Sequence, residues 1–285
     1  MPQERRLHRR AAAQPLGQDP ASDAARAVLG RARSKGELMD FARTDEQRML
    51  GETLDAMLTV ASSDWRIVGE AGLDALGIAA ADDGLGEEAR DAAVVAAAFG
   101  RANVVLPWAE HWVATRLGER GDGGPRAADP AAVLARAGNQ RAWAEDALTV
   151  LHCAEIVGLC RTMLRDAARF AKERRQFGVA IASFQALRHR MADMAMTLEL
   201  AAAMTDVAID ALDADDGNEA VRANAVSAAR VTCDDAARLV GEGAVQIHGA
   251  MGLTAELALG GYFRRARTLA QGDGTARAHL RRYAA

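Results

Sequence analysis

Three long segments without proline dominate the second half of this chain. In residues 145–172, large apolar side chains recur every three to four positions, from Leu148 to Phe170. The segments 183–212 and 219–248 show the same spacing, and each is followed by a polar or glycine-containing stretch. This spacing is that of an amphipathic helix with one buried face. Long helices joined by short turns predict an up-and-down bundle.

Shorter helical segments surround these three. Further helices are expected over 256–269 and from Thr275 onward, so that a bundle domain spans 146–285. Residues 37–118 predict a smaller helical domain, whose first helix has Thr44 as its cap and Gln47 three positions later. No alternating strand pattern of any length appears. The predicted fold class is therefore all-α, with an N-terminal helical domain and a C-terminal four-helix-type bundle.

Two stretches do not fit a helical domain. Residues 1–36 are rich in Arg, Ala, Gln and Pro and poor in large apolar side chains, which predicts a disordered tail. Its arginines leave a transit peptide open as an alternative to a solvated extension. Residues 119–145 carry several glycines and prolines and are interpreted as a linker.

Composition excludes several classes of protein. The net charge is −4 and no basic stripe interleaves with aromatic residues, so nucleic acid is not an expected partner. No apolar run approaches the roughly 20 residues of a membrane span, so a cytoplasmic protein is expected. The three cysteines, Cys153, Cys160 and Cys233, form no CxxC pair and are expected to be small buried side chains. The histidines show no metal-binding spacing, and no metal site is assigned.

Polar side chains and glycine gather where two of the long helices break. The first cluster is Glu173-Arg174-Arg175-Gln176-Phe177-Gly178, and the second is Gln246-Ile247-His248-Gly249-Ala250. Glycine frees the backbone at both places. An anionic, planar ligand is the kind of molecule that such clusters can hold.

These clusters and their surroundings resemble a known family. From about Ala147 onward the chain resembles the C-terminal domain of the flavin-dependent acyl-CoA dehydrogenases, and residues 41–118 look like the helical N-terminal domain of that family. Several motifs occur in the family's order and at about its spacing. They are Glu173–Gly178, Ser183-Phe184-Gln185, Ala192-Asp193-Met194, Ala244–Gly252 and Arg264–Arg267, with Glu46-Gln47-Arg48 and Leu76-Gly77-Ile78 in the N-terminal part.

The resemblance implies a reaction and its partners. Family members remove a proton from Cα of an acyl-CoA thioester while a hydride passes from Cβ to FAD, and the product is a trans-2-enoyl-CoA. An electron-transferring flavoprotein normally accepts the electrons. The chemistry needs a carboxylate as base and hydrogen bonds to the thioester carbonyl.

The resemblance also implies residues that hold FAD. Arg174 matches the arginine that pairs with the FAD pyrophosphate, although a solvated charge at a helix end is an alternative. Phe177 matches a position near the cofactor, with plain core packing as its alternative. His248 is interpreted as a satisfied histidine at a helix end and has no catalytic role. The implied cofactor-binding residues are Arg174, Gln176, Phe177, Gln185, Gln246, His248 and Gly249.

Two departures from the family pattern affect the expected activity. Family members carry a β-rich middle domain over the flavin ring, where this chain has only about residues 119–146. In the family, the arginine and glutamine–glycine elements reach an FAD whose ring lies in the neighbouring subunit. The family's Tyr-Glu-Gly-Thr motif, which carries the base, is here Gly272-Asp273-Gly274-Thr275. Asp273 is the candidate catalytic base, and an ordinary helix cap is its alternative.

Two classes of function remain open. In the first, the chain is an acyl-CoA dehydrogenase subunit that associates through its bundle, as a homo- or hetero-oligomer. Completion of the FAD site of a full-length partner is favoured here, because the missing middle domain leaves no shelf for a flavin ring. Heteromeric family members that act on steroid side-chain thioesters use such an arrangement. In the second class, the chain is a non-catalytic structural or regulatory helical protein.

Overall fold

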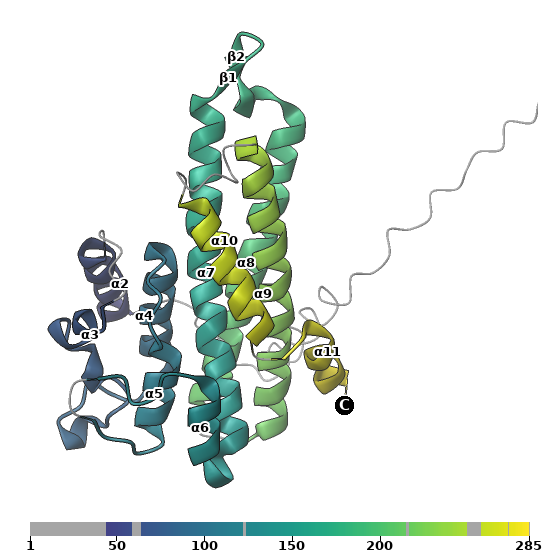
Figure 1. Ribbon diagram of the computed structural model, residues 1–285. Helices are drawn as coiled ribbons and strands as arrows, with labels where there is room; N and C mark the ends of the chain where they lie inside the picture. The colour runs from purple at the N-terminus through teal and green to yellow at the C-terminus, as the bar shows by residue number, and fades with distance from the viewer. Residues whose placement is uncertain are drawn as a thin grey trace, which may run out of the picture.

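The computed structural model describes residues 44–58, 64–121, 124–214, 217–249, 258–272 and 274–284. Three long helices form the centre of the molecule, and shorter helices pack on it (Figure 1). In chain order the helices are α2 (Asp45–Met57), α3 (Arg66–Glu70), α4 (Ala89–Ala102), α5 (Trp108–Arg116), α6 (Pro130–Arg136), α7 (Arg141–Glu173), α8 (Gln185–Asp213), α9 (Glu219–His248), α10 (Leu259–Gly272) and α11 (Ala276–Ala284). Single 3₁₀ turns lie at η1 (Leu73–Ala75), η2 (Ala80–Asp82), η3 (Gly138–Gln140) and η4 (Ile181–Ser183).

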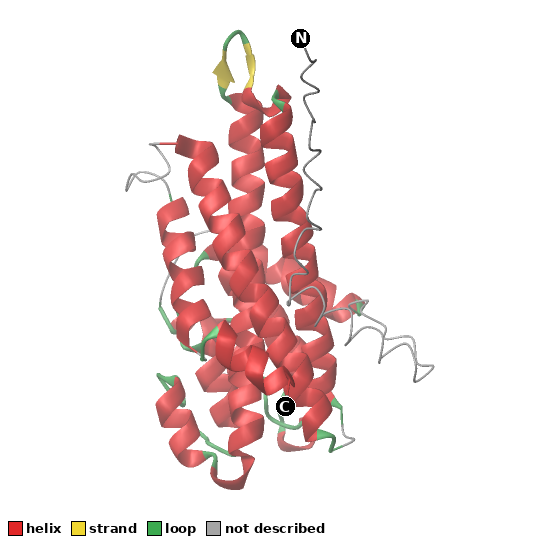
Figure 2. Ribbon diagram, turned by 90° about the vertical axis from the view of Figure 1, so that its right-hand side faces the viewer, coloured by secondary structure: helices red, strands yellow, loops and turns green. Residues whose placement is uncertain are grey.

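The predicted all-α class is confirmed. Within the described part of the chain, strand pairing is confined to a hairpin of β1 (Arg175–Gln176) with β2 (Val179–Ala180) and a bridge between Ile78 and Gly86 (Figure 2). The predicted capping box is present, because Gln47 N–H donates to Thr44 Oγ1 at 3.2 Å and Thr44 N–H donates to Gln47 Oε1 at 3.2 Å. Local capping therefore begins α2 where the sequence indicates.

The segment expected as a linker contains helical structure. Asp129 accepts a hydrogen bond from Ala132 N–H at 2.9 Å and is followed by proline, which begins α6. Helix α7 begins at Arg141, four residues before the predicted start. The predicted tail 1–36 lies outside the described residues. The division into domains at 119–145 stays a prediction.

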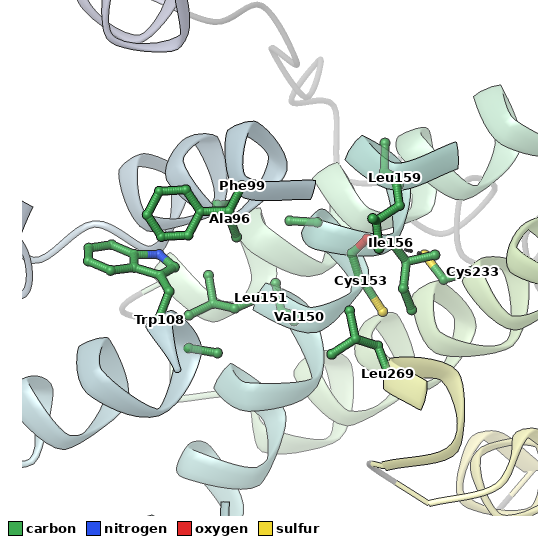
Figure 3. Packing of buried hydrophobic residues seen from close by; sticks show 14 of the residues in the cluster. Ala96, Phe99, Trp108, Val150, Leu151, Cys153, Ile156, Leu159, Cys233 and Leu269 are labelled. Carbon is green, nitrogen blue, oxygen red and sulfur yellow. Dashed lines mark hydrogen bonds between the residues drawn. The ribbon is translucent and has the colours of Figure 1, made fainter. Parts of the chain in front are cut away.

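One hydrophobic core joins the N-terminal helices to the bundle. Helix α4 packs along α7, and α7, α8 and α9 pack on one another. Phe99 and Trp108 share this core with Leu151 and Ile156 of α7 and with Leu269 of α10 (Figure 3). The three cysteines are buried in it with free thiols, as predicted.

Helix α7 is the most buried of the long helices. Residues Gly138–Glu173 are long and apolar enough to cross a membrane by length and composition. However, 89% of the most apolar window of this segment is buried inside the protein. The segment is therefore covered on most sides by the helices that pack around it.

Buried ion pairs tie the last two helices to this core. Arg265 of α10 donates to both carboxylate oxygens of Glu155 on α7, at 2.6 and 3.1 Å. Asp146, which has no exposed surface, pairs with Arg222 of α9 at 2.9 Å and with Arg282 of α11 at 2.5 Å. These pairs fix α10 and α11 against α7.

Candidate functional site

A short β-hairpin stands where the sequence shows its first polar cluster. Strand β1 continues from α7, and β2 leads through η4 into α8, with Arg175 opposite Ala180 and Gln176 opposite Val179. Phe177 and Gly178 form the loop with φ angles of 53° and 81°. Two left-handed residues in a two-residue loop are the geometry of a type I′ turn. The hairpin lies at one end of the bundle, beyond the start of α10 (Figure 1).

Phe177 is held in an unusual position at the hairpin tip. Its side chain is 90% exposed, so the alternative of plain core packing is wrong. Its ring meets the ring of Phe184 edge to face, with centroids 6.2 Å apart, and Phe184 is itself 37% exposed. A bulky residue at positive φ is strained, and such strain gathers at functional sites. The pair forms an open aromatic surface.

Cationic and polar side chains flank this aromatic pair along the chain. Arg174 ends α7, where its N–H donates to Phe170 O at 2.8 Å and its carbonyl accepts from Ile181 N–H at 2.8 Å. The backbone of Arg174 thus closes the base of the hairpin, while its side chain stays exposed. Arg175 and Gln176 are exposed beside it, and Gln185 is exposed at the start of α8. The geometry leaves these polar groups available to an external ligand.

The second polar cluster lies at the end of α9. Gln246 is exposed, and its Oε1 accepts a hydrogen bond from Arg190 of α8. Gly249 ends the helix with a φ of 64°, and its N–H donates to the carbonyls of Val245 and Gln246. Because that amide terminates the helix, it is already engaged.

His248 is buried rather than presented to solvent. Its Nδ1 lies 2.8 Å from Ala244 O, and its ring lies 4.5 Å from the ring of Phe170. These contacts favour the interpretation of a satisfied helix-end histidine. A contact of His248 with FAD stays a prediction.

A pocket between α8 and α9 extends from Gln246. It has a volume of about 490 Å³ and is lined by His189, Arg190, Asp193, Arg238, Glu242 and Gln246, among others. Arg190 and Phe184 were not among the predicted site residues. Phe184 falls inside the quoted Ser183-Phe184-Gln185 motif, whereas nothing in the sequence indicates that Arg190 reaches Gln246.

A different pocket lies at the junction of α10 and α11. Asp273 itself lies outside the described residues. Its neighbours Gly272 and Gly274 line a cavity of about 540 Å³ with Leu134 of α6, Thr149 of α7 and His279 and Arg282 of α11, among others. We call this the α6–α11 pocket. The α10–α11 junction lies away from the hairpin along the bundle (Figure 1).

The residues at the hairpin fit one half of an FAD molecule. Guanidinium groups bind diphosphates, and an open aromatic pair stacks on a planar base. The same residues do not supply a cover for the flavin half. Between α5 and α7, the described residues form α6 and η3 and no sheet that covers a ring.

Comparison with known proteins identifies the C-terminal half of the chain. Residues 148–285 match the family model described as acyl-CoA dehydrogenase, C-terminal domain. The acyl-CoA dehydrogenase IpdE2 of Mycobacterium tuberculosis is 36% identical over 126 residues, which are 44% of this chain and 37% of that protein. IpdE2 of Mycolicibacterium smegmatis is 35% identical over 137 residues, or 48% of this chain and 41% of that protein. The matched stretch thus spans less than half of either relative.

Solved structures resemble more of the chain. The ChsE4-ChsE5 complex from Mycobacterium tuberculosis has a TM-score of 0.74 at 18% identity, covering 86% of this chain and 98% of that one. A glutaryl-coenzyme A dehydrogenase in complex with glutaryl-CoA has a TM-score of 0.71 at 17% identity, covering 86% and 96%. At such identities the likeness concerns the fold. Residues 148–285 therefore form an acyl-CoA dehydrogenase C-terminal domain, and the solved structures extend the likeness in fold to most of the chain.

Proposed function

We propose that this chain is an acyl-CoA dehydrogenase subunit whose hairpin end completes the FAD site of a full-length family partner. The exposed, strained Phe177 beside Phe184 is the observation that carries this proposal. Packing within the chain does not require an aromatic side chain at that position. An external planar group explains both its exposure and its strain.

The charge around the hairpin suits a diphosphate. Exposed or partly exposed cations gather there, and fewer carboxylates lie among them. The cations are Lys172, Arg174, Arg175, Arg188 and Arg190, and the carboxylates are Glu173 and Asp193. Arginine binds phosphate oxygens with two parallel hydrogen bonds. We assign the diphosphate to Arg174 and Arg175 and the planar base to the Phe177–Phe184 pair.

The remaining predicted residues are assigned supporting roles. Gln176 and Gln185 flank the hairpin, and Gln246 is held by Arg190 in a position to contact the cofactor. Gly249 ends α9 beside them. FAD, when bound, supplies the hydride acceptor for α,β-dehydrogenation of an acyl thioester. This chain's part is to bind and orient its dinucleotide half.

The need for a partner follows from the missing cover over a flavin ring. A full-length homologue carries the middle domain that this chain replaces with α6 and η3. One structural neighbour is described as the ChsE4-ChsE5 complex and another as the Tcur3481-Tcur3483 steroid ACAD. We infer a similar pairing here, with a bulky acyl-CoA as substrate, an electron-transferring flavoprotein as acceptor and the cytoplasm as location.

Co-expression with a full-length homologue tests this function. The complex should be yellow, and its flavin-to-protein ratio should fall in Arg174→Ala, because a charge-assisted contact contributes roughly ten- to a hundredfold in affinity. Arg161→Ala, at an exposed residue of α7 away from the hairpin, is the matched control. Unchanged flavin content in Arg174→Ala would show that this arginine is only a surface charge. Failure to bind any family partner or flavin would favour the non-catalytic alternative.

The α6–α11 pocket supports a second candidate, a site of this chain's own. Residues on both sides of Asp273 border that pocket, so a carboxylate at this position is the candidate base. Asp273→Asn keeps the capping ability and removes the proton acceptor. A rate loss of at least about 100-fold in a complex with an intact partner would assign the base to this chain. An unchanged rate would assign it to the partner, the outcome we expect.

A further inference from the structure

A guanidinium group is buried completely inside the bundle. Arg230 of α9 has an exposed fraction of 0%. Burial of a charged side chain is strongly unfavourable unless hydrogen bonds and opposite charges compensate for lost water. An apolar side chain of similar length would fill the same space at lower cost. The contacts of Arg230 therefore indicate the function of its positive charge.

These contacts are the last carbonyl groups of α10. Arg230 Nη2 donates to Leu269 O at 3.0 Å and also to Ala270 O. Carbonyls in the final turn of a helix lack a partner within that helix. The last turn of α10 has no basic residue of its own. Arg230 supplies the positive charge and the donors that favour this helix end.

Neighbouring charges hold the guanidinium in place. Asp234 lies one turn further along α9, with its Oδ1 3.9 Å from Arg230 Nε. Burial raises the pKa of Asp234, while the charges of Arg230 and Arg267 oppose that rise. The guanidinium is thus fixed between a carboxylate of its own helix and the end of α10.

The α10–α11 junction is the segment between the end of α10 at Gly272 and the start of α11 at Ala276. Gly272 and Gly274 line the α6–α11 pocket. On the far side of this segment, Thr275 Oγ1 accepts from Ala278 N–H at 3.2 Å, and Arg282 joins α11 to the buried Asp146. Helices α10 and α11 are therefore anchored on the two sides of the junction, α10 through α9 and α11 through α7.

We propose that Arg230 is a positioning residue, which holds the last carbonyls of α10 and so sets where Gly272 and Gly274 meet the α6–α11 pocket. It acts through the backbone of α10. The inference rests on the second candidate site of the proposed function and not on the hairpin. Arg230 lies 16 residues before Gln246 on α9, or about 24 Å along the helix.

Amide hydrogen exchange in the full chain tests this role directly. In Arg230→Met, amides of residues 271–280 should exchange about ten- to a hundredfold faster, because the donors at the helix end are lost. Amides of α7 should keep their protection. Arg230→Lys should restore most of the protection, since an ammonium group can also donate to carbonyls. Arg161→Met makes the same chemical change at an exposed residue and should alter nothing.

Two results would overturn the proposal. One is unchanged exchange over 271–280 in Arg230→Met. The other is an increase shared equally by α7, α9 and α10, which would reveal general destabilisation. If Arg230→Met does not fold, Arg230→Gln keeps two donors without the charge, and the comparison with Arg230→Lys decides in the same way.

A second measurement separates this inference from the hairpin assignment. In a complex with a full-length partner, Arg230→Met should leave the flavin content unchanged. A loss of flavin would contradict a role confined to the α10–α11 junction. Conversely, if Arg174→Ala does not alter the flavin content, the hairpin assignment is wrong, but the exchange result still supports the role of Arg230.

Discussion

Gly100 of α4 and Gly158 of α7 make reciprocal close contacts where the two helices pack together. A Cβ atom at Gly100 would lie 2.2 Å from Glu155 O, and a Cβ atom at Gly158 would lie 2.2 Å from Ala97 O. Both contacts involve backbone atoms, so neither neighbour can swing away. The N-terminal helices and the bundle are therefore in contact at a distance that only glycine permits.

Gly158→Ala should destabilise the whole chain. Overpacking against backbone costs typically about 1–3 kcal/mol, and the better helix propensity of alanine offsets up to about 1 kcal/mol of it. Urea unfolding should show a lower midpoint. Gly260→Ala is the control, because a Cβ there meets nothing within 4 Å and α10 should gain stability. A Gly158→Ala variant as stable as its parent would show that the helices separate easily.

Phe177→Asn should stabilise the fold while it weakens the proposed site. Asn followed by Gly is the preferred pair for a type I′ turn, and a strained left-handed Phe costs about 1–2 kcal/mol. We expect a melting temperature equal to or above that of the parent and a lower flavin content in the complex. Gly178→Ala should lower the stability, because alanine is strained at the φ of 81° that Gly178 adopts. A clear loss of stability in Phe177→Asn would show that the ring is part of the packing.

Asp146→Asn should be strongly destabilising. Its buried carboxylate compensates Arg222 and Arg282, and loss of one partner from a buried ionic group costs about 3–5 kcal/mol. Chemical unfolding measures the loss. Asp166→Asn, which weakens exposed pairs with Arg165 and Arg169, should cost less than about 1 kcal/mol. Similar losses in the two variants would contradict the importance of the buried group.

Stability should fall as the pH is lowered below about 6.5. Burial, and then the charge of Arg126, lower the pKa of His111 from 6.5 to about 3. Between these values the unfolded chain binds a proton that the folded chain does not. Lower pH therefore favours unfolding, with a slope of up to about 1.4 kcal/mol per pH unit. Below about 3 this contribution changes no further.

His111→Gln tests the pH dependence because it removes the titrating group. Its free energy of unfolding should change less between pH 6 and 4 than that of the parent, on the order of a kcal/mol per unit. His189→Gln, at an exposed histidine, should keep the parent's slope. Equal slopes in all three proteins would show that other groups dominate acid unfolding.

Long helices were predictable from the sequence because their apolar spacing extends over many turns. The bounds of α9, Glu219–His248, match the prediction, since Asn218 and Gly249 mark its ends. The β1–β2 hairpin was missed because two-residue strands are too short to show alternation. Helix α6 was missed because its seven residues lie between glycines and prolines.

Parts of the candidate site depend on contacts between residues that are far apart in the sequence, and no local sequence pattern indicates such contacts. The motifs located Arg174 at the end of α7 and Gln246 near the end of α9, and these two helix ends meet where Phe170 contacts His248. The pairing of Arg190 with Gln246 joins residues 56 positions apart. The sequence also gives no sign that Arg230 is buried, because arginine on a helix is usually solvated.

Asp213 at the end of α8 accepts the backbone N–H groups of Ala89 and Arg90 at 2.7 and 3.2 Å. The start of α4 thus depends on a side chain that follows Ala89 by 124 positions. During translation, the early helices must leave the ribosome before the residue that caps them has been made. The first half of the molecule can reach its final form only after α8 has emerged, so a ribosome stalled within α8 holds a chain whose α4 still lacks its cap.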